Sequence, residues 1–132
     1  FNISLESGVD MVLWTLKNSY GGEILVPKIP SYRIMDMVSA FGEGIHVDKI
    51  GIRPGEKLHE EMISRSDSLN SVVFDNYYAI LPAGNSEILE HYISTFGAQK
   101  LPQGFSYSSD TNEDFLTVDE LKQLLSFYRS AK

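Results

Sequence analysis

A proline–glycine break at Arg53-Pro54-Gly55 is the feature that most constrains the fold, because it separates two segments with different hydrophobic patterns. Pro54 fixes its own φ and biases Arg53 toward an extended conformation, whereas Gly55 can turn where other residues cannot. The apolar run before the break predicts a strand over 45–52. The helical pattern after it predicts a helix that begins near Glu56.

This break would place Arg53 at the end of a strand and Glu56 at the start of a helix. Crevices outside the carboxyl ends of strands are where α/β proteins bind ligands. An arginine there offers a planar fork of donors that fits phosphate oxygens, and a carboxylate only accepts, which suits ribose hydroxyls. The alternative is a surface arginine and a glutamate favoured by the helix dipole. The spacing alone leaves both interpretations open.

The chain has 132 residues, which suits a single domain over 1–132 with one hydrophobic core. It has no cysteine, and its three histidines show no metal-ligand spacing, so we predict neither a disulfide nor a metal site. The formal net charge of −7 argues against a nucleic-acid-binding surface. An anionic ligand would therefore depend on local cations such as Arg53, Lys57 and Lys28.

The sequence contains no apolar run long enough to cross a membrane and no visible signal peptide, so no membrane association is expected. The absence of cysteine fits a reducing compartment, and we expect a cytoplasmic protein. The first residue is Phe1 rather than methionine, and a helix is expected within about three residues of it. We therefore expect the chain to be a piece of a longer protein.

Hydrophobic periodicity and turn residues divide the chain into helices and strands. Helices are expected over 4–16, 32–41, from Glu56, over 85–96 and from Thr117, and strands over 23–26, 45–52 and 72–82. The last helix begins with a capping box of Thr117 and Glu120 and places Arg129 and Lys132 near its C-terminal end, where cations are favoured. The order predicts an α/β fold with a small, parallel-leaning sheet and packed helices.

Lys28 and Ser31 are further candidate ligand-binding residues, in the loop between the strand at 23–26 and the helix at 32–41. Ser31 is expected to cap that helix, and a strand, loop and helix N-terminus in succession can receive an anion. Lys28 would lie near a ligand phosphate. The alternative for Lys28 is a solvated loop lysine.

Two aromatic residues allow both a functional and a structural interpretation. Trp14 would be a stacking platform for a base, or else pack in the core or at an oligomer contact, and the helical spacing favours packing. His59 would be an acid/base group, but no partner carboxylate can be assigned, so a structural role is favoured. The sequence has no glycine-rich dinucleotide fingerprint, phosphate-binding loop or nucleophile elbow. We therefore expect no catalytic residue in this chain.

Three segments carry a resemblance to a known family: GGEILVPKIPSYRIMDM, GIRPGEKLHEEMIS and FSYSSDTNEDFLTVDEL. In this order and at comparable spacing, they resemble the C-terminal half of the inverting UDP-N-acetylglucosamine 4,6-dehydratases. These enzymes are extended short-chain dehydrogenases/reductases, related to bacterial polysaccharide biosynthesis proteins. The resemblance covers nearly the whole chain, and VPKIPS and GIRPGEKLHE are its most specific parts.

The resemblance implies that this chain is the substrate-binding portion of such an enzyme. The full enzyme would bind NADP in an N-terminal Rossmann domain absent from this chain, with no cofactor bound here. It would convert UDP-N-acetylglucosamine to a keto-deoxy sugar on the route to pseudaminic acid, used in flagellin glycosylation and surface glycans, and would form a homo-oligomer.

The family's RPGE arginine and acid match Arg53 and Glu56. Wider epimerase relatives carry Asp where this chain has Glu56, which weakens the expected ribose contact. A second phosphate-binding arginine of such enzymes lies just before the position of Phe1 and is absent from this chain.

Other functions remain open. Within the family, the rivals are the capsule-type dehydratase that also epimerises C5 and the membrane-attached retaining branch, although the tail SYSSDTNEDFLTVDEL is more similar to the inverting branch. A rival of another class is a non-catalytic nucleotide-sugar-binding or assembly module. A third is an oligomerisation domain with Trp14 and the terminal helix as contacts.

Overall fold

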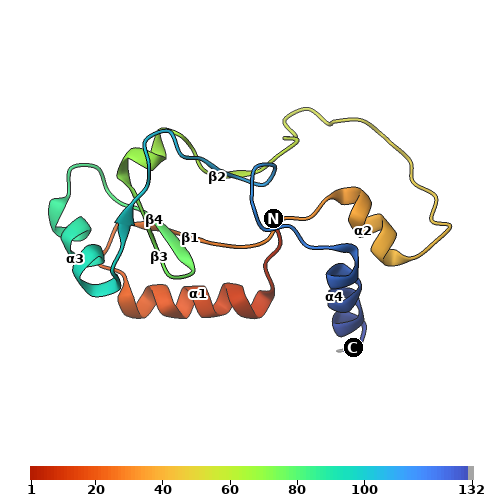
Figure 1. Cartoon of the computed structure of the whole chain (residues 1–132), viewed down its shortest axis with the longest axis horizontal. Helices are drawn as coiled ribbons and strands as arrows, with labels where there is room; N and C mark the ends of the chain where they lie inside the picture. The colour runs from red at the N-terminus through yellow and green to blue at the C-terminus, as the bar shows by residue number, and fades with distance from the viewer. Residues whose placement is uncertain (131–132) are drawn as a thin grey trace. The chain divides into compact units, whose positions relative to one another are not determined.

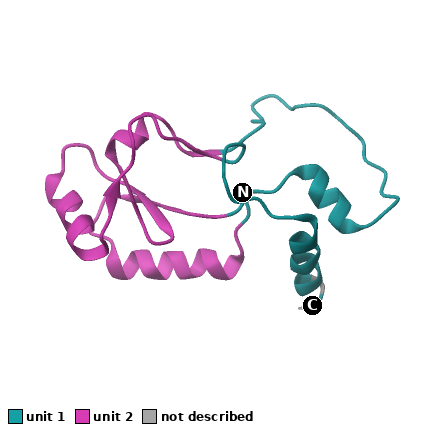
Figure 2. Cartoon of the chain, in the orientation of Figure 1, with its two compact units in different colours: residues 1–2, 30–60, 109–132 teal, residues 3–29, 61–108 magenta. Residues whose placement is uncertain are grey.

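The computed structural model describes residues 1–130, except the side chain of Arg129. The expected positions of the Arg129 side chain and of Lys132 therefore lie outside the described part. The chain divides into two compact units, each assembled from separated segments (Figure 2). Unit 1 contains residues 1–2, 30–60 and 109–132, and unit 2 contains residues 3–29 and 61–108. A single substrate-binding domain remains a prediction, and each unit is described by itself.

Unit 2 combines helices with two small antiparallel sheets (Figure 1). Its helices are α1 (Leu5–Asn18), the 3₁₀ helix η1 (Asp67–Asn70) and α3 (Ser86–Phe96). The larger sheet has the order β1-β4-β3-β5, formed by Ile24–Pro27, Tyr77–Ile80, Ser71–Phe74 and Gln99–Lys100. The smaller sheet pairs β2 (Glu61–Ile63) with β6 (Tyr107–Ser108). Ala79 in β4 lies opposite Leu25 in β1 and Val72 in β3, which defines the register of β4 with both neighbouring strands.

The α/β composition is confirmed, but the expected parallel pairing is wrong, because every strand pair described in the two sheets is antiparallel. The segment 72–82 was expected to be one strand, whereas it forms the hairpin β3–β4. Its turn is at Asp75 and Asn76, and Asp75 has a φ of 37°. Aspartate and asparagine tolerate this left-handed conformation, and two-residue turns of this kind join antiparallel strands.

The core of unit 2 lies between the larger sheet and helices α1 and α3. Its buried side chains are Val72, Phe74, Ala79, Leu81, Ile88, Tyr92 and Ala98. The Trp14 ring lies 5.2 Å from that of Tyr77 and 5.2 Å from that of Phe96, between ring centroids. The favoured interpretation of Trp14 as a packing residue is therefore confirmed.

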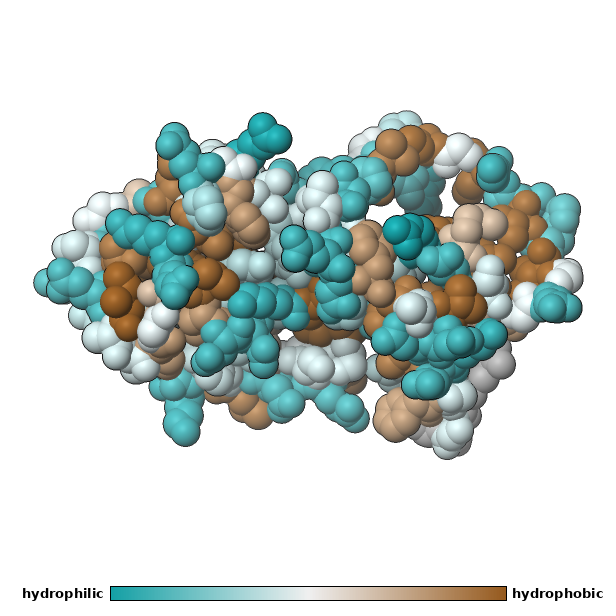
Figure 3. Space-filling view, in the orientation of Figure 1, coloured by the Kyte–Doolittle hydropathy of each residue, from teal (hydrophilic) through white to brown (hydrophobic). Residues whose placement is uncertain are grey.

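Helix α1 is the helix expected at the start of the chain, and the backbone N–H of Ser7 donates to the Ser4 hydroxyl that caps it. The hydrophobic stripe of α1 that lies away from Trp14 remains exposed; its members are Leu5, Val9, Val12, Leu13 and Leu16. Hydrophobic residues reach the surface in both units, as the space-filling view shows (Figure 3). No helix within the described residues is long and apolar enough to span a membrane.

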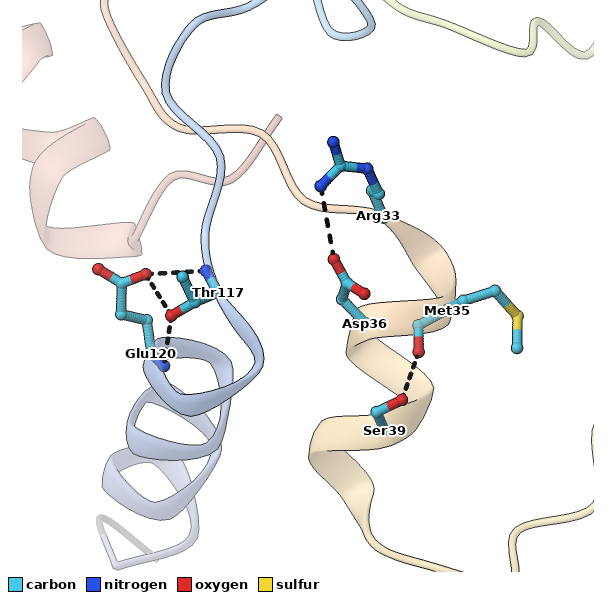
Figure 4. Close-up of polar contacts among 6 residues, drawn as sticks. All are labelled: Arg33, Met35, Asp36, Ser39, Thr117 and Glu120. Atoms are coloured by element: carbon cyan, nitrogen blue, oxygen red, sulfur yellow. Dashed lines mark hydrogen bonds and ion pairs between the residues drawn. The ribbon is translucent and has the colours of Figure 1, made fainter.

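Unit 1 is built on two helices, α2 (Ile34–Phe41) and α4 (Val118–Ser130), which pack against each other (Figure 1). The predicted capping box at the start of α4 is confirmed. The Glu120 backbone N–H donates to Thr117 Oγ1, and the Glu120 carboxylate accepts from the Thr117 backbone N–H at 2.8 Å (Figure 4). These bonds satisfy backbone groups that a helix end otherwise leaves unpaired.

Two expected elements of unit 1 do not form. Segment 45–52 is not a strand, because no described strand of this unit lies beside it to complete a ladder. The helix expected from Glu56 is replaced by a turn, in which the Glu56 backbone N–H donates to the Arg53 carbonyl at 3.0 Å. Gly55 has a φ of 81°, a conformation that glycine adopts readily and that belongs to this turn. The periodic residues at 61–63 instead form β2.

A buried tyrosine and a glutamate tie α3 to the segment before β1 in unit 2. Tyr92 Oη donates to Glu23 Oε1 at 2.9 Å, and the backbone N–H groups of Tyr20 and Gly21 donate to the same carboxylate at 2.6 and 2.7 Å. Partial burial by itself would raise the pKa of Glu23, but these hydrogen bonds outweigh it and lower that pKa. Burial and the neighbouring carboxylate raise the pKa of Tyr92.

Tyr92→Phe is expected to lower the free energy of unfolding at neutral pH by about 1 kcal/mol, because the ring stays and one charged hydrogen bond is lost. Trp14 is the only tryptophan and packs in the same unit, so its fluorescence during urea unfolding measures the change. The pKa of Glu23 is lower in the folded protein than in the unfolded protein, so the ionised carboxylate stabilises the fold at neutral pH. This contribution is lost as the pH falls through the pKa of the folded state. The difference between the two proteins should therefore shrink below pH 4.5. Tyr20→Phe is the control, and an equal loss there would contradict the assignment.

Candidate functional site

Arg53 and Glu56 face each other across the turn at the proline–glycine break. The guanidinium lies 3.2 Å from Glu56 Oε1, and the Arg53 backbone N–H donates to Glu56 Oε2 at 2.9 Å. The Arg53 guanidinium, followed by its backbone N–H, lowers the pKa of Glu56, so this carboxylate is ionised at neutral pH and only accepts hydrogen bonds. The turn thus presents the hydrogen-bond donors of the Arg53 guanidinium beside the Glu56 carboxylate, which accepts hydrogen bonds.

Both side chains of this pair are open to solvent, with 77% of the Arg53 side chain and 41% of the Glu56 side chain exposed. Exposed ion pairs contribute little to stability, because water and salt screen them. A phosphate can therefore replace the Glu56 carboxylate on the Arg53 fork at small cost. That exchange would leave Glu56 free to accept from other donors.

Ser31 lies inside unit 1 rather than on its surface, with 1% of the residue exposed. Its backbone N–H donates to the Asp114 carbonyl at 2.8 Å, and its hydroxyl accepts from the Asn112 side chain at 3.1 Å. The expectation that Ser31 caps α2 is wrong, because α2 begins at Ile34 and Arg33 occupies the cap position. A ligand contact of Ser31 remains a prediction.

Lys28 belongs to unit 2, where its ammonium donates to the Asp75 carbonyl at 2.6 Å. The ammonium also lies 5.4 Å from the centroid of the Tyr78 ring. These contacts lie between the exposed Lys28 side chain and the β3–β4 hairpin. Its proposed role beside a ligand phosphate remains a prediction.

A cavity of about 400 Å³ lies within unit 1, and its lining includes Tyr32, Arg33, Ile34, His59, Glu60 and Phe115. The Arg33 guanidinium lies 4.6 Å from the centroid of the Phe115 ring and 3.8 Å from the Asp36 carboxylate (Figure 4 shows the ion pair). Arg33 was not among the residues expected to bind a ligand. It lies inside the helix predicted over 32–41, and its partner ring is distant in sequence.

His59, for which acid/base and structural roles were weighed, lines this same cavity. Among residues 1–130, no group of three or more potential ligands lies close enough to hold a metal ion. What the described site offers is therefore hydrogen-bond donors, carboxylate acceptors and an aromatic face. Such groups bind and orient a polar ligand with a flat apolar part.

Comparison with known proteins identifies relatives over nearly the whole chain. The inverting UDP-N-acetylglucosamine 4,6-dehydratase of Campylobacter jejuni is 44% identical over 130 residues, which cover 96% of this chain and 39% of the enzyme. The UDP-glucose 4-epimerase of Rickettsia prowazekii is 32% identical over 95% of this chain and 37% of the enzyme. Pen from Bacillus thuringiensis has a similar solved structure, with a TM-score of 0.74, 25% identity, and coverage of 96% of this chain and 38% of Pen.

The chain thus spans about two fifths of the length of the curated relatives that it matches. The family model described as polysaccharide biosynthesis protein matches residues 1–82, from the start of the chain through the β3–β4 hairpin. Because this match covers more than half of its residues, the chain belongs to the polysaccharide biosynthesis protein family.

Proposed function

We propose that this chain is the nucleotide-sugar-binding portion of a 4,6-dehydratase that acts on UDP-N-acetylglucosamine. Arg53 holds the diphosphate of the substrate, and Glu56 holds the adjoining ribose. The observation that supports this assignment is the convergence of the two side chains on one exposed turn, 3.2 Å apart. The name of the Campylobacter jejuni relative supports the substrate and the reaction.

The proposed role of this portion is to position the substrate, not to transfer protons or hydride. The diphosphate and uridine are remote from the hexose carbons that react. Their binding energy fixes the hexose in place, which lowers the entropic part of the barrier in the complete enzyme. Glu56 is kept ionised by Arg53, so it accepts hydrogen bonds from hydroxyl groups rather than donating a proton.

The dehydratase reaction implies NADP, which would accept and return a hydride when bound. The residues described here do not fit that cofactor, because the strands pair antiparallel and do not form the parallel βαβ unit that binds a dinucleotide. We propose that NADP binds in an additional domain of the complete protein, which is cytoplasmic and homo-oligomeric. We also propose that its product leads to pseudaminic acid and flagellar glycans.

A second candidate is a portion of a UDP-sugar epimerase, supported by the 32% identity to the Rickettsia prowazekii enzyme. Both candidates would bind UDP through the same residues, and they differ in the reaction that the hexose undergoes. The C5 configuration of the product of the complete protein, determined by NMR, separates the inverting dehydratase from the capsule-type and retaining branches. Selective UDP binding without any such turnover would favour the non-catalytic module.

Arg53→Ala is expected to weaken UDP binding by about 2–3 kcal/mol, the value of charge-assisted hydrogen bonds to phosphate. Isothermal titration calorimetry of this chain with UDP measures the loss. Arg65→Ala removes an arginine of unit 2 and should leave the affinity unchanged. Equal affinities for the wild type and Arg53→Ala would refute the phosphate role.

The chain by itself is expected to form no 4-keto sugar from UDP-N-acetylglucosamine, even with added NADP, because it lacks a dinucleotide-binding unit. Product NMR after long incubation provides the measurement. The same assay on the Campylobacter jejuni relative provides the positive control. Turnover by residues 1–132 alone would overturn the assignment of catalysis to the additional domain.

A further inference from the structure

Helix α1 has two apolar sides, and one of them packs within unit 2. The side that carries Trp14 packs on the larger sheet and on α3, because the Trp14 ring contacts those of Tyr77 and Phe96. A surface helix of a globular protein ordinarily has one apolar stripe, which faces the core. The second apolar side of α1 therefore indicates a partner beyond residues 1–130. Its members are Leu5, Val9, Val12, Leu13 and Leu16.

These five side chains form one continuous exposed stripe. They are between 49% and 82% exposed, and they recur at intervals of three and four residues along the helix. Most of them, together with Ile3, line an open groove of about 640 Å³. Proteins rarely leave large contiguous apolar patches in contact with water, and patches of this kind mark interaction sites.

The charged residues of α1 lie on a third side of the helix. Glu6, Asp10 and Lys17 are exposed, and their spacing of four and seven residues places them together, away from the stripe. Two carboxylates and one ammonium give this side a net negative charge. Helices that lie on a membrane carry Lys and Arg on their polar side, which attract anionic lipids. The charge of α1 therefore disfavours a lipid surface and favours a protein surface as the partner.

The remaining part of the complete protein is the protein surface that fits best. The family model matches residues 1–82, so α1 belongs to the part of the chain that the family shares. The chain spans only about two fifths of the length of its curated relatives, so most of each relative has no counterpart here. A surface on the same polypeptide is present at a high effective concentration, which favours it over a second copy.

We propose that the exposed stripe of α1 is the docking surface for the additional, dinucleotide-binding domain of the complete protein. The stripe leaves water when that domain packs on it, while the charged side of α1 stays in solvent beside the contact. Helix α1 is then enclosed between the core of unit 2, on its Trp14 side, and the additional domain. The inference rests on the proposed function for the existence of that domain, and it is independent of the roles of Arg53 and Glu56.

Thiol labelling of the complete protein tests this surface, because residues 1–132 contain no cysteine. Leu13→Cys places a thiol on the stripe, and Asp10→Cys places one on the charged side as the matched control. Peptide mass spectrometry follows each site separately from any other cysteine. Leu13→Cys should react at least about tenfold more slowly than Asp10→Cys, since a reagent reaches a buried thiol only after local opening. Adding Val12→Glu to Leu13→Cys should remove the protection, because a carboxylate is costly to bury against an apolar surface.

The outcomes separate this proposal from the proposed function. Equal labelling rates at the two sites, in a complete protein that forms the 4-keto sugar, would overturn the docking surface and leave the proposed function standing. Protection that is lost on serial dilution would also overturn it, because the stripe would then contact a second copy. Protection in a protein that neither binds UDP nor forms product would support the docking surface and overturn the proposed function. Circular dichroism melting checks that each variant folds, and Val9→Cys, on the same stripe, replaces Leu13→Cys if that variant does not fold.

Discussion

The pairing of Ser31 with Phe115 is the contact on which the arrangement of unit 1 depends. The Ser31 N–H donates to the Asp114 carbonyl, and the Leu116 N–H donates to the Ser31 carbonyl, both at 2.8 Å. The Asn112 side chain donates to the buried Ser31 hydroxyl and to the Asp114 carbonyl. A buried serine with every polar group paired leaves little freedom for the backbone on either side. The entry to α2 and the entry to α4 are therefore fixed relative to each other within this unit.

The turn at Arg53 and Glu56 is held in a different way. Its hydrogen bonds are local and exposed, and its ion pair is of the kind that solvent weakens. The proposed diphosphate role of Arg53 depends on this weakness, because a phosphate would have to displace only an exposed carboxylate from the guanidinium.

Local signals in the sequence were sufficient where the structure depends on local contacts. The caps at Ser4 and at Thr117 with Glu120 were predicted, because capping joins residues three apart. The closeness of Arg53 and Glu56 follows from the same spacing. The pairing direction of the strands was not predictable from hydrophobicity. A two-residue turn at Asp75 and Asn76 decides it, and the alternation of apolar residues does not change across that turn.

Long-range contacts explain the remaining differences. Segment 45–52 has the apolar pattern of a strand, but a strand also needs a neighbour, and hydrophobicity does not specify one. The stack of Arg33 on Phe115 joins residues on two segments that only the folded chain brings together. Both residues lie in segments that carry the family resemblance, but no pattern within either segment marks them as a pair.

The discontinuous make-up of the two units has a consequence for biosynthesis. Unit 2 is complete when residue 108 has been added, whereas Ser31 in unit 1 must wait for Asp114 and Leu116 before its backbone groups find their partners. A nascent chain therefore carries α2 without α4 while residues 42–117 are added. Closing so long a loop is slow compared with forming a hairpin, so unit 1 is expected to acquire its native structure after the β3–β4 hairpin of unit 2.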